Sequence, residues 1–338
     1  MMAKKKLNPP FDWESWYQAC DGRVDHTLQA SKIVAKIYNE QAPKFTGFVE
    51  STTRPFGSPD QASKFVITVA KGAGAAAVGI TKIEPSDVYD GRSVNETYAI
   101  AIGQRMLWKH FQTVPSQESG VECCRVYYDL GAICIAVADA LRERGYPARV
   151  EDPVGDSDLM HIPIALRAGF GELGRHGSII HPELGPLFRL GTVVTDLPMT
   201  CDEPVDLGIA EFCDRCKACQ KYCPADAIPE ERNPAAGVDP IGKTRYVLDT
   251  GCCFPYFARQ HYCSICLAVC AYKHKQWAQD FTGEQTKLSP TTLLKILHLR
   301  LICHHRPGRT IIQAQSIVQP KQPRPVSCLK HCIKLPAI

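Results

Sequence analysis

The segment 213-CDRCKACQKYCP-224 decides the fold, because it holds four cysteines at offsets 0, 3, 6 and 10 and a proline after the last one. In two-cluster bacterial ferredoxins, the first three thiolates of such a run bind one [4Fe–4S] cluster and the fourth binds another. The segment therefore predicts two clusters, with further ligands elsewhere in the chain.

A second cysteine segment, 252-CCFPYFARQHYCSICLAVC-270, repeats the back half of the first. Its last three cysteines have offsets 0, 3 and 7, and one more upstream thiolate completes a set of eight. The ferredoxin pairing rule then predicts two ligand sets. The first is Cys213, Cys216, Cys219 and Cys270. The second is Cys223, Cys263, Cys266 and either Cys252 or Cys253.

A pair of zinc sites is the alternative, since CxxC pairs also suit zinc. The full CxxCxxCxxxCP run favours clusters, because its closely packed cysteines surround a cube better than a tetrahedral ion. The other eight cysteines lack such spacing and are interpreted as ordinary residues, with Cys134 on an apolar helical stripe. They are Cys20, Cys123, Cys124, Cys134, Cys201, Cys303, Cys328 and Cys332.

The composition is that of a globular chain: 338 residues, of which 45% are hydrophobic and 22% charged. We find no export signal at the start and no run of about eighteen apolar residues. We therefore expect a cytoplasmic protein without a membrane partner. In a reducing compartment, clustered cysteines bind metal more often than they form disulfides.

The formal charge of +4 is concentrated in residues 282–338, which hold nine Lys or Arg residues and one acid. The rest of the chain is net negative, so its charge favours no nucleic-acid partner. The tail is basic and proline-rich, and we expect it to be a disordered extension.

Helices and strands alternate upstream of the cysteines, which predicts an α/β core with helices covering a sheet. Helical periodicity and capping residues predict helices over 26–40, 58–72, 126–144 and 158–168. Strands are predicted over 76–83, 146–152 and 189–196.

A glycine-rich run, 169-GFGELGRHGSIIHPELGPLFRLGTVVTDLP-198, follows the last of these helices. Its five glycines between 169 and 185 allow sharp turns or close approach of the backbone to another group. The run lacks the dinucleotide fingerprint in a strand–turn–helix context, which argues against NAD.

Several separated motifs resemble the corrinoid and iron–sulfur core of reductive dehalogenases, in that family's order. They are AGFGELGRHGSIIHPELGPLFRLGTVVTDLP, the CxxCxxCxxxCP run, CFPYF…YCSICLAVC, GAGAAAVGITKIEPSDVY and ADALRERGYPAR. The resemblance covers about residues 60 to 280, and epoxyqueuosine reductases share the same architecture. Two departures are Ala271, where the family usually has proline, and the tail, which matches nothing in the family.

The resemblance implies an α/β (α+β) fold with a nitroreductase-like corrinoid-binding domain and a C-terminal ferredoxin-like domain with two [4Fe–4S] clusters. The domains expected are an N-terminal extension 1–57, the corrinoid-binding catalytic domain 58–205, the ferredoxin-like domain 206–281 and the tail 282–338. It also implies a cobalamin-type corrinoid bound base-off. Electrons from an external donor pass through both clusters to the cobalt, and a proton replaces a halide on an organohalide.

The resemblance assigns roles to individual residues. The proton donor is Tyr127 or Tyr128, and we prefer Tyr127 because it shares a helical stripe with Leu130 and Cys134. Its basic partner is Arg189 or, second, Arg175, because a cation lowers the pKa of a phenol. Cys253 is preferred to Cys252 as the eighth ligand. The residues expected near the corrin or its nucleotide tail are His161, Gly171, Gly174, Arg175, His176 and Gly177.

The chain resembles the soluble catabolic type of dehalogenase, with a halogenated small molecule as substrate and a separate ferredoxin or flavoprotein reductase as electron donor. Two alternatives stay open. One is an epoxyqueuosine reductase-like tRNA-modification enzyme, with Asp156 or Asp158 as proton donor. The other is a ferredoxin-type electron-transfer protein whose large domain is a docking module.

Overall fold

The computed structural model describes residues 28–155 and 157–273, all of which belong to one compact unit, Met1–Gly283. Asp156, the start of the predicted N-terminal extension and the predicted tail therefore lie outside the described residues. The same holds for Cys20, Cys303, Cys328 and Cys332.

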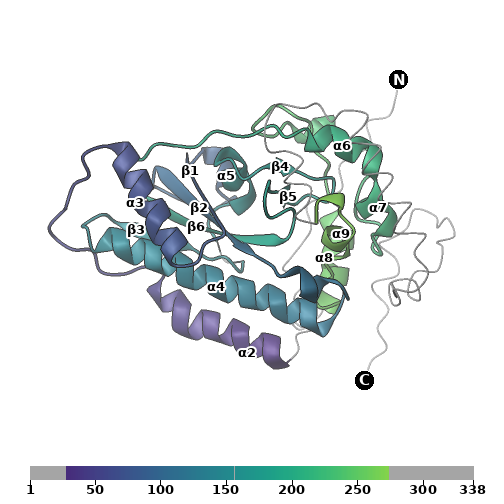
Figure 1. Ribbon diagram of the computed structural model, residues 1–338, viewed down its shortest axis with the longest axis horizontal. Coiled ribbons are helices and arrows are strands. Elements are labelled where there is room, and N and C mark those ends of the chain that lie inside the picture. The colour runs from purple at the N-terminus through teal and green to yellow at the C-terminus, as the bar shows by residue number, and fades with distance from the viewer. Residues whose placement is uncertain (1–27, 156, 274–338) are drawn as a thin grey trace. The chain divides into compact units, whose positions relative to one another are not determined.

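The centre of the unit is an antiparallel sheet of four strands in the order β1-β2-β6-β3 (Figure 1). These strands are β1 (Ala77–Lys82), β2 (Tyr98–Arg105), β6 (Phe188–Thr195) and β3 (Ala148–Glu151). The register places Ile100 of β2 beside Ile80 of β1 and Val193 of β6. Nonlocal pairing thus joins strands that are far apart in the sequence.

Side chains of β2 alternate between two hydrophobic clusters, one on each face of the sheet. Ile100 and Ile102 pack with α3 and α4, whereas Ala99 and Ala101 pack with α5. The small alanines permit the close approach of α5, because successive side chains of a strand point to opposite faces. The sheet is thus covered on both faces, by the helices α3 (Pro59–Gly72), α4 (Gln117–Arg142) and α5 (His161–Arg167).

Capping side chains explain where the two long helices begin. Ser58 accepts a hydrogen bond from the backbone N–H of Gln61 at the start of α3, as predicted. Ser116 and Ser119 form a reciprocal capping box at the start of α4, which begins nine residues before the predicted start at Val126. The helix α2 (Leu28–Lys36) packs against α4.

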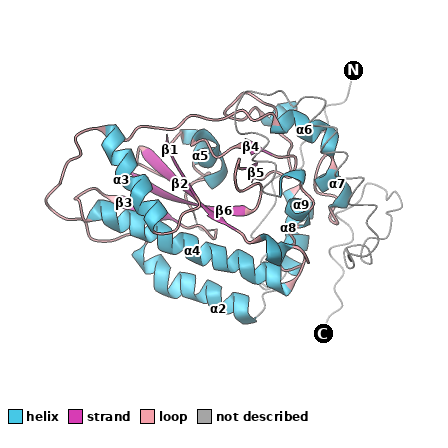
Figure 2. Ribbon diagram, in the orientation of Figure 1, coloured by secondary structure: helices cyan, strands magenta, loops and turns pink. Residues whose placement is uncertain are grey.

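The cysteine segments form short helices that lie together beyond the sheet, beside a small two-stranded hairpin (Figure 2). The hairpin consists of β4 (Glu172–Leu173) and β5 (Ile179–Ile180). The helices are α6 (Ile209–Cys216), α7 (Ala218–Tyr222), α8 (Thr250–Arg259) and α9 (Ile265–Ala268). A π-helical turn covers Ile37–Gln41, and 3₁₀ turns cover Ala42–Lys44, Pro85–Asp87, Trp108–Phe111, Pro234–Ala236 and Ala271–Lys273.

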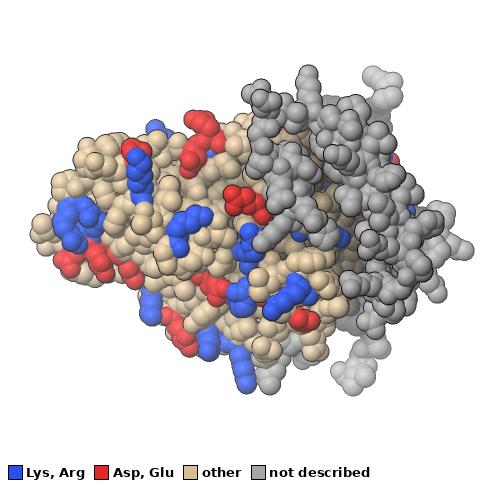
Figure 3. All heavy atoms as spheres, viewed as in Figure 1, with Lys and Arg blue, Asp and Glu red and all other residues tan. Residues whose placement is uncertain are grey.

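The predicted mixed α/β class is confirmed, although β2 was not predicted and every strand pairing of the sheet is antiparallel. Among the described helices, none combines the length and apolar character needed to cross a bilayer. On the face shown in Figure 3, acidic and basic side chains are interspersed over the described part of the surface.

Candidate functional site

The first predicted cysteine set comes together around one cavity. Cys213, Cys216, Cys219 and Cys270 line it, with Arg175 and His176 on its wall. Lys217, between α6 and α7, has a left-handed backbone (φ 48°) that separates Cys216 from Cys219 by a sharp turn. Burial raises the pKa of Cys219 to about 12, and the nearby charges of Cys213 and Cys216 raise it too.

Cysteines of the second predicted set also lie close together, since Cys253 and Cys266 pack against the hydrophobic cluster that contains Cys223. Burial raises the pKa of Cys253 to about 12, with smaller contributions from Cys223 and Cys263. Burial likewise raises the pKa of Cys266. The nearby charges of Cys263 and Cys253 raise it further. Cys252 and Cys253 both pack against the hydrophobic cluster that contains Cys223, so the choice of Cys253 stays a prediction.

The spacing of the sulfurs distinguishes a cluster from a single ion. Four thiolates at about 2.3 Å from a tetrahedral zinc lie about 3.8 Å apart. Within residues 28–155 and 157–273, no three cysteine sulfurs lie within 4.8 Å of one another. Neither set is therefore arranged around one tetrahedral ion in the described residues, and the assignment to cubane clusters stays a prediction from the cysteine spacing.

Four consecutive residues leading into α9 have left-handed backbone angles. They are His261, Tyr262, Cys263 and Ser264, with φ between 24° and 61°. Left-handed geometry costs a non-glycine residue about 1–2 kcal/mol. Packing against α4 holds this strained turn, since a side chain at Gly120 would lie 3.2 Å from the His261 carbonyl oxygen. The turn positions Cys263 for the second set.

Tyr127 and Arg189 meet beside the second set. The guanidinium carbon of Arg189 lies 5.4 Å from the centroid of the Tyr127 ring. Arg189 Nη2 lies 3.3 Å from Cys123 Sγ, to which it donates, and Cys123 is one helical turn before Tyr127. Tyr127 and Cys266 pack against the same hydrophobic cluster, which places the second set on this side.

Burial and the charge of Arg189 have opposite effects on the pKa of Tyr127. Burial raises the pKa of the Tyr127 phenol, and the positive charge of Arg189 lowers it. Burial lowers the pKa of Arg189, but the adjacent Tyr127 and Cys123 raise it, with a net rise. Arg189 therefore stays charged, and its Nε is buried without a hydrogen-bond partner among the described residues. Such a donor suits a developing anion.

Tyr128 and Arg175 have other surroundings. The carbonyl of Tyr128 accepts a hydrogen bond from Gln41 Nε2 (2.9 Å), on the side of α4 that faces the π-helical turn. Arg175 is buried and donates to the carbonyl of Cys213 (2.7 Å) and to the hydroxyl of Tyr246 (3.0 Å). The structure thus brings Tyr127 to Arg189, which are the preferred members of the predicted pairs.

The histidines predicted near a corrin have protein surroundings. The distance from His161 Nδ1 to Thr192 Oγ1 is 2.8 Å, and that from His161 Nε2 to the carbonyl oxygen of Asp152 is 3.1 Å. Burial lowers the pKa of His161, and it lowers the pKa of His176 to about 4. His176 lines the first cysteine cavity.

Gly171, Gly174 and Gly177 belong to the β4–β5 hairpin and the turn within it. A Cβ at Gly171 would lie 2.1 Å from the carbonyl oxygen of Ile180, and Gly171 and Gly177 have φ of 132° and 76°. Local packing therefore explains these glycines. At the six positions expected near the corrin, no observation in the described residues indicates that cofactor, and those contacts stay predictions.

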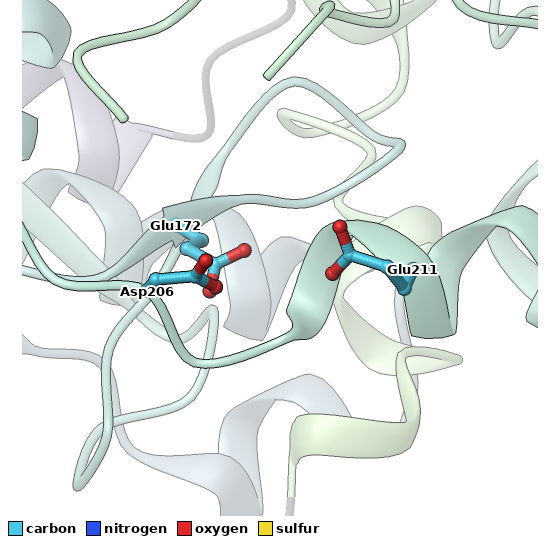
Figure 4. Close-up of side chains that lie close together, drawn as sticks. All are labelled: Glu172, Asp206 and Glu211. Carbon is cyan, nitrogen blue, oxygen red and sulfur yellow. The ribbon is translucent and has the colours of Figure 1, made fainter. Parts of the chain in front are cut away.

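An acidic cluster of Glu172, Asp206 and Glu211 lies next to the hairpin (Figure 4). Lys243 Nζ lies 3.4, 2.5 and 3.1 Å from these three carboxylates, so an ammonium already neutralises them. We interpret the cluster as a structural ion-pair network that joins the hairpin to α6 and to the loop containing Lys243.

Sequence reasoning missed Cys123, Cys124 and Tyr262. Cys124 Sγ donates to the hydroxyl of Tyr262 at 3.8 Å, which links α4 to the turn before Cys263. The i, i+4 spacing of Cys123 and Tyr127 was the available signal, because such residues share a helix face. Asp158, an alternative proton donor, lies 3.2 Å from both Arg92 and Arg149.

No family model matches the chain. A tetrachloroethene reductive dehalogenase from Desulfitobacterium hafniense (strain Y51) is 31% identical over 228 residues, which are 64% of this chain. The chain is similar to reductive dehalogenases. It spans 40% of the length of that relative.

Solved reductive dehalogenase structures share the fold, with a TM-score of 0.70 over 81% of this chain and 41% of theirs, at 22% identity. One is described with B12-dependent dehalogenation, and another is a catabolic reductive dehalogenase in complex with 3-bromo-4-hydroxybenzoic acid. An epoxyqueuosine reductase from Salmonella typhimurium (strain LT2) is 39% identical, but only over 77 residues, or 23% of this chain. The predicted resemblance to reductive dehalogenases is confirmed, and the epoxyqueuosine alternative is not favoured.

Proposed function

We propose that this chain contributes the proton-donating and electron-delivering parts of a corrinoid-dependent reductive dehalogenase. The observation on which the proposal depends is the contact of Arg189 with Tyr127 beside the second cysteine set. The overall reaction converts an organohalide, two electrons and a proton into a hydrocarbon and a halide ion. The similarity to tetrachloroethene reductive dehalogenase supports this class of oxidoreductase.

Two [4Fe–4S] clusters would be held by the two cysteine sets, and they would supply single electrons in sequence. The second set neighbours Arg189, so it would be the cluster nearer the substrate. The first set neighbours Arg175 and His176. The cysteine segments would form the ferredoxin-like domain over 206–281, and the sheet with α3, α4 and α5 the nitroreductase-like domain over 58–205.

A base-off corrinoid is proposed from the resemblance alone. When bound, it would supply the reducing equivalents that break the carbon–halogen bond. The roles proposed for Tyr127 and Arg189 also come from the resemblance, and the contact between the two side chains supports them.

Tyr127 is the proposed proton donor to the carbon that loses the halide. Burial keeps its phenol protonated at neutral pH, so a proton is available at Oη. Arg189 would stabilise the phenolate that forms, and its unpaired buried Nε would donate to the departing halide. Cys123 holds the guanidinium in place through its contact with Nη2.

The proposed partners are a halogenated small molecule and an external ferredoxin or flavoprotein reductase, and the proposed location is the cytoplasm. One similar structure is in complex with 3-bromo-4-hydroxybenzoic acid, so aryl halides are the first class to test.

The test is halide release by the full chain after anaerobic reconstitution with iron, sulfide and cobalamin, with a chemical reductant and a panel of aryl and alkyl halides. We expect stoichiometric halide and dehalogenated product from at least one substrate. A chain that holds both clusters and a corrinoid but releases no halide from any of them would overturn the proposal. A chain that holds both clusters but shows no corrinoid absorption would favour the electron-transfer alternative.

A further inference from the structure

His176 is a buried histidine with a fixed tautomer. Its side chain is 4% exposed, and its Nδ1 accepts a hydrogen bond from the backbone N–H of Ser178 at 3.2 Å. A nitrogen that accepts has no proton, so the ring proton is on Nε2. Nε2 is therefore a hydrogen-bond donor.

This donor has no protein partner among the described residues. His176 Nε2 is buried and makes no hydrogen bond there, although leaving a buried donor unsatisfied costs about 1–3 kcal/mol. The neighbouring Arg175 differs, because its guanidinium donates to the carbonyls of Cys213 and Pro229 and to Tyr246. His176 Nε2 is thus a buried donor on this wall that makes no hydrogen bond to the described residues.

The same side chain lines the cavity formed by Cys213, Cys216, Cys219 and Cys270. We propose that His176 Nε2 donates a hydrogen bond to a sulfur of the first [4Fe–4S] cluster and raises its reduction potential. The inference rests on the cluster assignment of the proposed function. It gives His176 a position beside iron and sulfur in place of the predicted position beside a corrin.

The direction of the effect follows from charge. Reduction adds negative charge to the cluster, and hydrogen bonds to its sulfurs are among the factors that set its potential. A donor interacts more strongly with the more negative state. Loss of the donor should therefore make the first cluster harder to reduce and leave the second unchanged.

The test is a redox titration of the reconstituted full chain, followed by electron paramagnetic resonance. His176→Leu should shift one of the two potentials to a more negative value, by about tenfold in the reduction equilibrium, or about 59 mV for one electron. His176→Gln keeps an N–H at the same distance along the side chain and should restore most of the shift.

His181→Leu is the matched control. His181 is also partly buried, and its Nδ1 accepts from the backbone N–H groups of Glu183 (3.0 Å) and Leu184 (3.3 Å). Its ring packs against Phe170 and Phe188 and does not line the cysteine cavity. Both potentials should be unchanged in this variant.

A measurement on the unmutated chain covers the case in which the leucine variant does not fold. With ¹⁵N-labelled histidine, pulsed resonance of the reduced protein should show a weak ¹⁵N coupling to one cluster, absent in His176→Gln. Two results would overturn the inference while leaving the cluster assignment intact: unshifted potentials in a fully loaded His176→Leu, or no ¹⁵N coupling. A chain without iron or sulfide would instead overturn the cluster assignment, and the inference with it.

Discussion

At the scale of single residues, the proposed proton donor is a half-buried phenol on whose pKa two effects act in opposite directions. Burial raises the pKa of Tyr127, and Arg189 limits the rise. A general acid must hold its proton until the transition state, and burial keeps the Tyr127 phenol protonated. The positive charge of Arg189 would then stabilise the phenolate that forms when the proton is transferred.

Replacement of Tyr127 tests this role. Tyr127→Phe should lower halide release by about 10²–10⁴-fold, because the ring is kept and only the proton donor is lost. Iron content and cluster spectra should be unchanged. Tyr128→Phe is the matched control on the next residue and should keep near-normal turnover. If the Tyr127 variant keeps its turnover, or if the Tyr128 variant loses it, the assignment is wrong.

The pH dependence of Tyr127 tests the part played by Arg189. A phenol donates while protonated, so its contribution is present below its pKa and is lost as pH rises through that value. The pKa of Tyr127 is raised from 10.0, so the loss should begin only above about pH 10. Arg189→Met removes the charge that favours the phenolate and should raise this pKa further.

Ultraviolet titration of tyrosinate would measure this shift, with the Tyr127→Phe spectrum subtracted. Arg189→Lys keeps a cation and should give a smaller change than Arg189→Met. A lower pKa in Arg189→Met would contradict the account.

The meeting of Tyr127 and Arg189 was predicted from the resemblance together with one helical stripe, whereas their catalytic roles stay predictions. Tyr127 shares a helical stripe with Leu130, and Arg189 lies in the strand that pairs with β2. The place of His176 on the wall of the first cysteine cavity could not be predicted from local sequence, since that cavity is formed with cysteines 37 to 94 positions away.

At the scale of elements, the sheet and its helices depend on close approaches that only small residues permit. A Cβ at Gly79 in β1 would lie 2.2 Å from the carbonyl oxygen of Ala168, at the end of α5. The glycine is therefore required by packing between the sheet and α5, a distant contact that no sequence window contains.

Gly79→Ala should lower the free energy of unfolding by about 1–3 kcal/mol, because α5 must move away from the sheet. Gly72→Ala is the matched change at the end of α3, where an added Cβ meets no atom within 4 Å. It should raise stability by about 0.4–1 kcal/mol. Urea unfolding of both variants measures the difference, and equal effects would contradict this packing.

The ion-pair network around Lys243 provides a second test at this scale. Lys243→Met should destabilise the fold by about 1–3 kcal/mol, since Glu172, at 1% exposure, loses its cation. Lys64→Met is the control, because its ion pair with Asp60 is exposed and is worth at most about 0.5 kcal/mol. The midpoints of urea unfolding measure the stability of both variants. An unchanged midpoint in Lys243→Met would show that the network is not structural.

Local patterns predicted α3 and its cap, but they missed β2 and the first turns of α4. The alternation in β2 is between isoleucine and alanine, so both faces are apolar and no polar face marks the strand. The capping box of Ser116 and Ser119 precedes a stretch rich in charged and small residues, which hid the start of α4.

At the scale of the whole molecule, the cysteine segments and the sheet domain are joined by buried polar contacts. Arg175, from the glycine-rich hairpin, bonds to the carbonyl of Cys213, and Lys243 reaches Glu172. Cys124 of α4 is linked in the same way to Tyr262, in the turn before Cys263. The two cysteine sets and the Tyr127–Arg189 pair thus lie in one compact unit.

The pairing of the cysteines was predictable from spacing, because ferredoxin-type runs exchange their fourth ligand. The choice of Cys253 over Cys252 needed the resemblance, since spacing allowed both. The antiparallel strand order was not predictable, because β6 pairs with β2 and β3, neither of which is the strand next to it in the sequence.

The central claim is that two sets of four cysteines hold two cubane clusters, and metal analysis tests it most directly. After anaerobic reconstitution, we predict about eight iron and eight acid-labile sulfide per chain. Cys253→Ser should lower both toward about four, while Cys252→Ser should keep about eight. Stoichiometric zinc without sulfide, or the same loss in both variants, would contradict the account.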